Sequence, residues 1–377
     1  MTDIDTPPRI ILLGATGYTG DLTARSLIAQ GARPMLVARN LDRVRALAAE
    51  LGGLDTAVAD VNAPDTIRAV LRKGDVLIST VGPFLRYGRP AVRSAAEAGA
   101  HYIDSSGEGP FIREVFEHWG NVAERNHATL LPAFGFDFVP GALAAALALD
   151  EAGPDATAVD IAYFSSGFVP SGGTQASALR VLFEDNFAFR DGHVRGERVG
   201  RFVKRFEVEG TSRTAASIPA AEHLGLPQSY PRLRDITVML GLGDQEVRIM
   251  STAAHIASAL SRVKPIAREM ASLTDRFSKG STGGPDEAER AKARATVVAV
   301  AGRTIGSPAE LDPLATVTLT GPNPYDITAD LLAWAAIAAA GGELRRTGAA
   351  GPISAFGTDA VRAGCELAGI SDSDPAF

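Results

Sequence analysis

Short apolar segments alternate with amphipathic ones over the first 140 residues. The apolar segments are rich in Val, Ile and Leu, whereas the segments between them repeat apolar residues at helical spacing, as Leu41, Val44 and Leu47 do. Buried strands that alternate with helices are typical of a parallel, doubly wound sheet. We therefore expect six strands, over residues 9–13, 34–39, 56–59, 75–81, 101–103 and 129–133.

The pattern changes after about residue 141. Several segments are longer or alternate between apolar and polar residues, which favours an α+β region with a mixed or antiparallel sheet. The expected strands are residues 159–164, 202–208, 236–240, 296–301 and 315–320, with a helix over 174–187 and a flexible loop over 279–286. Residues 325–340 are apolar nearly all round a helix, which predicts a helix buried on several sides.

The composition is that of a globular protein with about two or three domains. The 377 residues are 46% hydrophobic and 21% charged, and the net charge of −7 argues against a general nucleic-acid binder. The single cysteine excludes an intramolecular disulfide and fits a reducing compartment. No signal peptide is recognisable, and the longest apolar segments are shorter than the ~20 residues of a membrane-spanning helix, so we expect a cytoplasmic protein without a transmembrane segment.

A glycine-rich turn follows the first expected strand. Gly14, Gly17 and Gly20 form a G-x-x-G-x-x-G motif between that strand and a helix. Glycines permit a tight turn and close approach of the backbone to a pyrophosphate, and the helix N-terminus offers free N–H groups to the phosphates. At the start of six alternating strands and helices the motif predicts a dinucleotide site, and a purely structural turn is the alternative.

The end of the second expected strand bears on which dinucleotide binds. An acidic residue at this place binds the ribose 2′-hydroxyl of NAD, whereas an arginine suits the 2′-phosphate of NADP. The chain has Arg39 here, and the nearest acidic residue, Asp42, comes three positions later. NADP(H) is therefore the expected cofactor, and a solvated surface charge is the alternative reading of Arg39.

Polar residues gather after the fifth expected strand. Tyr102, Asp104 and Glu108 lie near the carboxyl edge of the sheet, where ligands bind in open parallel sheets. Each is a candidate general acid, with helix capping by Asp104 and core packing of Tyr102 as the alternatives. Asp137, between two phenylalanines, is a second candidate or a helix cap. Residues 171–175 either bring Thr174 or Gln175 to the substrate or cap the helix that follows.

Other catalytic patterns are missing from the sequence. The six histidines lack paired metal-ligand spacing, so no metal site is expected. No Gly-x-Ser-x-Gly elbow is present, which disfavours an α/β-hydrolase. No tyrosine is followed four positions later by lysine, so the mechanism of the short-chain dehydrogenases is not supported.

Five segments, taken in chain order, resemble one family. They read GATGYTG at 14–20, STVGPF at 79–84, HYIDSSGE at 101–108, GFDFVPG at 135–141 and GPNPYDITA at 321–329. Together they resemble the saccharopine dehydrogenase-like oxidoreductases, and within them the branch described as trans-acting enoyl reductases. The resemblance is dense over residues 9–141 and returns at 321–357.

The resemblance implies a split α/β architecture. An N-terminal Rossmann domain with a doubly wound parallel sheet would be followed by an inserted α+β domain and a C-terminal helix that returns to the Rossmann domain. The implied bounds are 1–140 for the NADP-binding domain, 141–322 for the α+β substrate or oligomerisation domain, and 323–377 for the C-terminal segment.

The resemblance also implies which residues contact the cofactor. The 2′-phosphate would lie at Arg39 and the adenine near Asp60. The pyrophosphate and the nicotinamide ribose would lie at two further sets of residues. These are Gly14, Thr16, Gly17, Tyr18, Thr19 and Gly20 for the pyrophosphate, and Thr80, Val81, Gly82 and Pro83 for the ribose.

The implied function is that of an NADP(H)-dependent reductase, which transfers hydride to a polarised C=C or C=N bond of a small-molecule or acyl-thioester substrate. A non-catalytic NADP(H)-binding redox sensor or scaffold is the alternative, because some Rossmann proteins that have this turn and lack the Tyr-x-x-x-Lys pair act in that way. Relatives in this family also occur with lipid bodies, but no basic amphipathic helix supports membrane docking. A homo-oligomer, in the form of a homodimer, is a further expectation.

Overall fold

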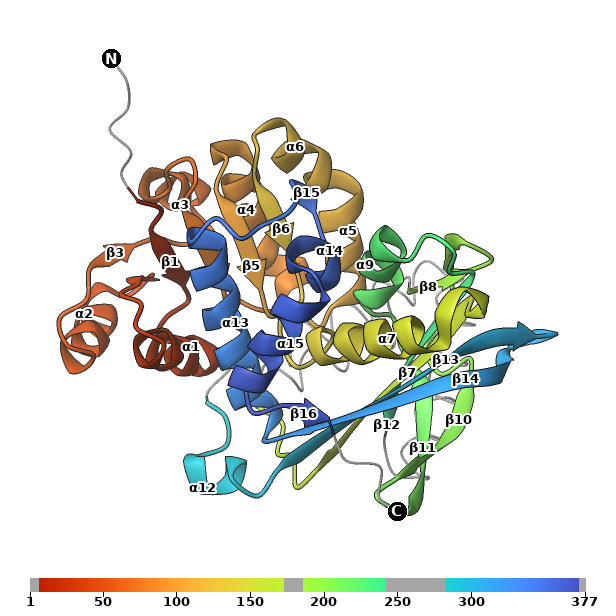
Figure 1. The fold of residues 1–377 in the computed structure, drawn as a ribbon. Coiled ribbons are helices and arrows are strands. Elements are labelled where there is room, and N and C mark those ends of the chain that lie inside the picture. Colours follow the sequence, from red (N-terminus) through yellow and green to blue (C-terminus); the bar gives the residue numbers. More distant parts are fainter. Residues whose placement is uncertain (1–6, 173–185, 242–282, 373–377) are drawn as a thin grey trace, which may run out of the picture.

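Two β-sheets, with helices around and between them, make up the fold (Figure 1). The structure, a computed structural model, describes residues 7–172, 186–241 and 283–372. Within these ranges the first sheet is parallel throughout, in the order β15-β6-β5-β4-β1-β2-β3. Its strands are β1 (Ile10–Leu13), β2 (Met35–Ala38), β3 (Thr56–Val58), β4 (Val76–Ser79), β5 (His101–Asp104), β6 (Thr129–Leu131) and β15 (Gly348–Ala349). The six strands expected from the sequence and their doubly wound order are confirmed, whereas the short seventh strand was not expected.

Helices cover both faces of the first sheet. They are α1 (Tyr18–Ala29), α2 (Leu41–Glu50), α3 (Pro64–Val70), α4 (Phe84–Ala98), α5 (Gly109–Glu114), η1 (Val115–Trp119), α6 (Gly120–Arg125) and α13 (Pro324–Ala340). Successive side chains of a strand point to opposite faces, so Leu77 belongs to the core under α4, and Ile78 belongs to the core under α1 and α13. The late apolar helix therefore returns to the first sheet, as expected.

The second sheet is mixed. Its described strands run in the order β10-β11-β12-β7-β13-β14-β16, with β8 and β9 at its side, and only the β12–β7 pair among them is parallel. The strands are β7 (Ala158–Ser166), β8 (Phe187–Arg190), β9 (His193–Gly196), β10 (Val203–Val208), β11 (Thr211–Ser217), β12 (Asp235–Gly241), β13 (Arg294–Ile305), β14 (Ser307–Gly321) and β16 (Ser371–Asp372). The expected α+β region with a mixed sheet is confirmed.

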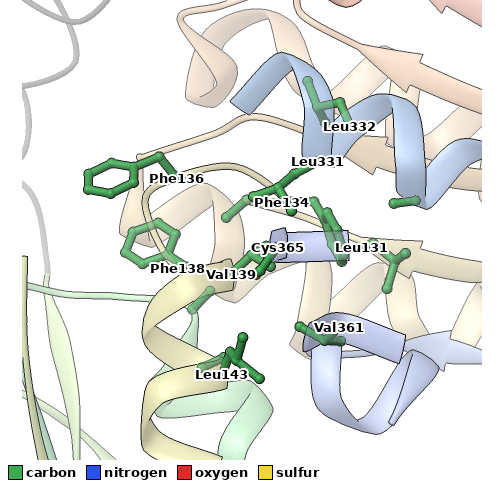
Figure 2. Close-up of a cluster of buried hydrophobic side chains, with 14 of the residues drawn as sticks. Leu131, Phe134, Phe136, Phe138, Val139, Leu143, Leu331, Leu332, Val361 and Cys365 are labelled. Atoms are coloured by element: carbon green, nitrogen blue, oxygen red, sulfur yellow. The ribbon is translucent and has the colours of Figure 1, made fainter. Parts of the chain in front are cut away.

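One apolar core joins the two sheets. The helix α7 (Val139–Ala152) packs on β7, β13 and β14, and α15 (Thr358–Leu367) packs on α7 and α13. Figure 2 shows Leu143 of α7 beside Val361 and Cys365 of α15, with Leu331 of α13 above them. The remaining helices are η2 (Gly153–Asp155), α9 (Glu222–Ser229), α12 (Glu287–Arg290) and α14 (Pro352–Phe356). This continuous core fixes the position of the second sheet relative to the first.

Two expected elements fall partly outside the described residues. For the helix expected over 174–187, residues 173–185 are not described, and Phe187 begins β8. For the loop expected over 279–286, residues 283–286 have no regular secondary structure and lead into α12. The domain bounds at 140 and 322 stay a prediction.

Candidate active site

The glycine-rich turn joins β1 to α1 in a shape that only small residues permit. Gly14 has a φ of +89°, and a Cβ atom there would lie 2.8 Å from the side-chain oxygen of Thr80. A Cβ atom on Gly20 would lie 2.2 Å from the Gly14 carbonyl oxygen, so α1 packs closely against the end of β1. Gly17 caps α1 without a side-chain hydrogen bond, which leaves the first N–H groups of the helix to a ligand. These features fit the pyrophosphate of a dinucleotide.

Two arginines lie beside this turn. The carbonyl oxygen of Val37, near the end of β2, accepts hydrogen bonds from the backbone N–H groups of the turn, so the exposed Arg39 follows directly at its edge. Arg43, in the first turn of α2, is also exposed, and its guanidinium donates a 3.5 Å hydrogen bond to the Thr16 carbonyl. The sequence analysis missed Arg43, whose signal was its place four residues after Arg39. Together the two guanidinium groups fit a 2′-phosphate.

The loop after β4 is bonded to the glycine turn. The backbone N–H of Thr80 donates to the Leu13 carbonyl over 3.0 Å, and its hydroxyl lies 3.3 Å from the Gly14 carbonyl oxygen. Gly82, two residues later, is exposed at the carboxyl edge of the sheet. The expected cofactor-binding residues of the turn and of this loop are therefore brought together.

The three catalytic candidates after β5, Tyr102, Asp104 and Glu108, form what we call the β5 cluster. All three side chains are fully buried. The two carboxylate oxygens of Glu108 accept hydrogen bonds from the backbone N–H groups of Phe84, over 2.7 Å, and Leu85, over 3.1 Å. Glu108 thus caps the N-terminus of α4, a stabilising contact for an anion.

Asp104 also bonds mainly to backbone. One of its carboxylate oxygens accepts from the N–H groups of Ser106, over 2.8 Å, and Ala133, over 2.9 Å. The other oxygen, the Tyr102 hydroxyl and the Ser79 hydroxyl have no hydrogen-bond partner among the described atoms. Burial raises the pKa of Asp104 to about 6 and the pKa of Tyr102 well above its usual value. The geometry gives this cluster a structural role, and its catalytic role stays a prediction.

Asp137 lies in the loop between β6 and α7 and reaches solvent. The residue is exposed, and one carboxylate oxygen lies 3.8 Å from the position a Cβ atom would take on Gly107, in the loop after β5. The next residue, Phe138, has a φ of +106°, an unfavourable value for a residue with a side chain. The Phe136 N–H donates to the Thr328 hydroxyl over 3.0 Å, which ties the loop to α13. Loss of hydration among the surrounding protein raises the pKa of Asp137 to about 6.

A tyrosine and a glutamate from the second sheet region approach this loop. Tyr163 of β7 donates a 2.6 Å hydrogen bond to Glu222 of α9, and both side chains are buried. The rings of Phe136 and Phe138, which flank Asp137, meet the Tyr163 ring edge-on at 5.6 and 6.4 Å; Figure 2 shows these two phenylalanines side by side. We call Asp137, Tyr163 and Glu222 the β6 cluster. The sequence analysis missed Tyr163 and Glu222, because no local pattern links them to Asp137.

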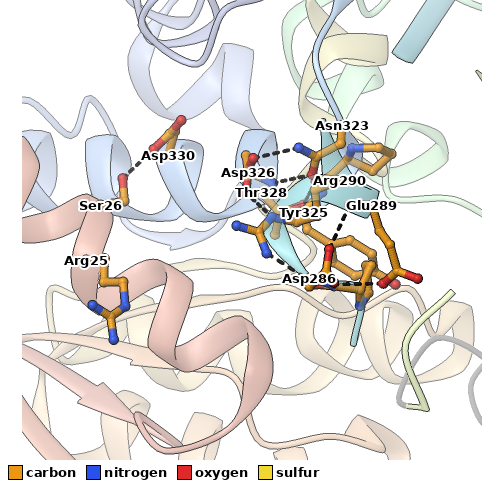
Figure 3. A network of polar contacts seen from close by, with 12 residues as sticks. Arg25, Ser26, Asp286, Glu289, Arg290, Asn323, Tyr325, Asp326, Thr328 and Asp330 are labelled. Atoms are coloured by element: carbon orange, nitrogen blue, oxygen red, sulfur yellow. Dashed lines mark hydrogen bonds and ion pairs between the residues drawn. The ribbon is translucent and has the colours of Figure 1, made fainter. Parts of the chain in front are cut away.

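A segment before β13 contacts the glycine turn through Tyr18. The Tyr18 hydroxyl donates to the Pro285 carbonyl over 2.7 Å, and its ring meets Tyr325 of α13 edge-on at 5.1 Å. Arg290 pairs with Asp326 over 2.8 Å (Figure 3). Because the Tyr18 side chain is held by protein groups, its backbone N–H is the part available to a pyrophosphate.

The remaining residues that the sequence predicted for the site lie away from the β5 and β6 clusters or outside the described residues. The Ser171 N–H donates to the Tyr325 hydroxyl over 2.6 Å, whereas Thr174 and Gln175 lie outside the described residues. The Asp60 carboxylate accepts hydrogen bonds from the backbone and side-chain nitrogens of Asn62, so it forms a local turn after β3. Its proximity to the adenine stays a prediction. Within the ranges that the structure describes, no helix is both long and apolar enough to cross a membrane.

Comparison with known proteins reveals relatives over part of the chain. A trans-acting enoyl reductase of Mycobacterium ulcerans is 33% identical over 195 residues, which cover 48% of this chain and 47% of that protein. A Mycobacterium tuberculosis protein that is provisionally named a trans-acting enoyl reductase is 39% identical over 186 residues, which cover 46% of this chain and 44% of that protein. The chain thus spans about half the length of the curated relatives it matches.

A solved structure shares the whole fold. Apo saccharopine dehydrogenase (L-Glu forming) from Saccharomyces cerevisiae matches with a TM-score of 0.58 and 14% identity, covering 97% of this chain and 100% of that one. Residues 10–129 also match the family model of the saccharopine dehydrogenase NADP binding domain. This range contains the glycine turn, both arginines and the loop after β4. The resemblance to saccharopine dehydrogenase-like oxidoreductases is therefore confirmed, and the match of residues 10–129 supports NADP(H) as the cofactor.

Proposed function

We propose that the chain is an NADP(H)-dependent reductase that uses Asp137 as its proton donor. One observation carries this proposal: Asp137 is an exposed residue of the loop after β6, and its carboxyl group lies beside Gly107, at the sheet edge where the cofactor-binding loops end. Ligands of open parallel sheets bind at this edge. When bound, the cofactor supplies the hydride, so the protein has to orient the substrate and provide one proton.

The properties of Asp137 suit proton transfer near neutral pH. With a pKa of about 6, a fraction of Asp137 is protonated at neutral pH and can donate a proton. The carboxylate that remains after proton transfer is also stable at that pH. The loop is held by the Phe136–Thr328 hydrogen bond and by the two rings against Tyr163, so the carboxyl position is fixed before substrate binds. Asp137 therefore replaces the β5 cluster as the first candidate, because Glu108 and Asp104 already bond to backbone N–H groups.

The comparisons and the chemistry support two substrate classes. The curated relatives named for enoyl reduction favour the conjugated C=C bond of an acyl thioester, and the shared fold with a saccharopine dehydrogenase leaves a C=N bond as the second class. In both, hydride reaches one atom of a polarised double bond, and Asp137 gives a proton to the other. A homodimer and a cytoplasmic location stay predictions.

The test is single-turnover oxidation of bound NADPH, followed by its absorbance, with a panel of enoyl thioesters and imines. We expect oxidation with one class and transfer of deuterium from labelled NADPH to the product. Tight NADPH binding without oxidation by either class would contradict the proposal and would support the non-catalytic sensor or scaffold.

A further inference from the structure

Glu222 is a buried carboxyl group with a single side-chain donor. It is 2% exposed, and one of its oxygens accepts the 2.6 Å hydrogen bond from Tyr163. Its other oxygen has no hydrogen-bond partner among the described atoms. A buried carboxylate without a cation or several N–H donors is costly, whereas the protonated acid is not. This environment differs from that of Glu108, whose two oxygens both accept from backbone N–H groups.

Among the residues that the structure describes, no cation pairs with Glu222. The titratable groups around it are Tyr163 from β7, His223 from α9, Arg190 from β8 and Asp137 from the loop after β6. Both ring nitrogens of His223 contact backbone groups, and burial lowers its pKa to about 3, so the ring is neutral. Arg190 pairs with Glu197 over 2.8 Å. The first turns of α7 and α14 bring no charged residue.

The pair of Tyr163 and Glu222 presses against the start of α7. A Cβ atom on Gly141 would lie 1.8 Å from the Tyr163 hydroxyl oxygen and 2.7 Å from Glu222, so glycine is required there. The Tyr163 ring also meets the rings of Phe136 and Phe138, which flank Asp137, edge-on at 5.6 and 6.4 Å. Tyr163 therefore contacts the loop of Asp137 through its ring and Glu222 through its hydroxyl.

We propose that Glu222 is a positioning residue that keeps its proton at neutral pH and, through Tyr163, holds the loop of Asp137 so that Asp137 alone ionises during turnover. The assignment of turnover rests on the function proposed above. Asp137 gives its proton to the substrate and regains one from solvent, while Glu222 keeps its own. An ionised Glu222 would repel the Asp137 carboxylate and disfavour its formation. Burial and the charge of Asp137 raise the pKa of Glu222 to about 8, which supports the proposal.

The first test is infrared spectroscopy of the full-length protein at pH 7. We expect the carbonyl stretch of a protonated carboxyl group in the wild type, its loss in Glu222→Gln, and its retention in Glu108→Gln, the matched control. The band should also disappear from the wild type as the pH rises through about 8. A Glu222→Gln spectrum that still contains the whole wild-type band would overturn the proposal. Should that variant not fold, Tyr163→Phe should shift the band without removing it, and an unshifted band would contradict the hydrogen bond.

The second test is the pH dependence of stability. A carboxyl group whose pKa is raised on folding stabilises the protein below the unfolded pKa, and this stabilisation is lost as the pH rises through the folded pKa. The melting temperature of the wild type should therefore fall between about pH 4.5 and 8 more steeply than that of Glu222→Gln. Parallel curves would contradict a protonated Glu222. Neither test needs substrate, so its failure is distinct from a failure of the proposed reductase activity.

The pH profile of turnover then tests the link to Asp137. Glu222→Gln should lose or shift the alkaline limb of the profile, while a purely structural role would lower the rate equally at every pH. An unchanged limb would show that Glu222 does not act through Asp137.

Discussion

The β5 cluster and the β6 cluster contain the same kinds of residue but differ in what bonds to their carboxyl groups. In the β5 cluster, backbone N–H groups of Phe84, Leu85, Ser106 and Ala133 donate to the acids, and all three side chains are buried. In the β6 cluster, Asp137 is an exposed residue, and the one hydrogen bond to the Glu222 side chain within the described residues comes from the Tyr163 hydroxyl. A carboxylate that accepts several backbone hydrogen bonds is committed to holding loops, whereas one that reaches solvent is available to a substrate.

The largest expected effect separates the clusters by rate. Asp137→Asn removes the proposed proton donor, so turnover should fall by ~10²–10⁴. The NADPH dissociation constant and the melting temperature should change little. Glu108→Gln is the matched comparison, measured on the same substrate. Full activity in Asp137→Asn together with a large loss in Glu108→Gln would reverse the comparison and restore the original prediction for the β5 cluster.

The next effect separates the clusters by stability. Glu108→Ala removes the acceptor of two backbone N–H groups, and each buried donor left without a partner costs ~1–3 kcal/mol. Glu108→Gln keeps an acceptor oxygen and should lose less. Denaturant unfolding monitored by circular dichroism measures both, with Asp137→Asn as the control because its side chain is exposed. Equal stability of all three variants would mean that the cap on α4 contributes nothing.

A catalytic role for either cluster requires that NADP(H) binds at the glycine turn. Arg39→Ala should weaken NADPH binding by roughly 1.5–3 kcal/mol and leave NADH binding nearly unchanged, because only NADPH carries the 2′-phosphate. Arg43→Ala should act in the same direction. Arg45→Ala, another exposed arginine of α2, is the control in calorimetry of both cofactors. Wild-type affinities that are equal for NADPH and NADH would contradict the site.

The smallest effect concerns the contact between the turn and the second sheet region. Tyr18→Phe removes the hydrogen bond to Pro285 but keeps the ring against Tyr325, so the free energy of unfolding should fall by only ~0.5–1.5 kcal/mol. NADPH affinity should stay near that of the wild type. A loss of affinity comparable to that of Arg39→Ala would show that the hydroxyl, and not the backbone N–H, serves the cofactor.

The features that depend on neighbouring residues in the chain could be predicted from the sequence. The apolar segments predicted the six strands of the first sheet, and their alternation with helices predicted the parallel order. Gly14 and Gly20 were recognisable because a turn at positive φ and a close helix approach both need glycine. Arg39 was recognisable by its place after β2. The segment at 325–340 predicted its own burial, since an apolar helix has no polar face to present to solvent.

Contacts between distant elements set which acids accept backbone hydrogen bonds. Tyr102, Asp104 and Glu108 were candidates because they lie near the carboxyl edge of the sheet, but the hydrogen bonds of the two acids depend on where the N-terminus of α4 and the loop after β6 lie. Tyr163 and Glu222 come from β7 and α9, and their contact with the loop of Asp137 arises because the core between the sheets brings these elements together. A sequence pattern shows which residues repeat along one helix or strand. It does not show which hydrogen-bond donors a distant element will bring to them.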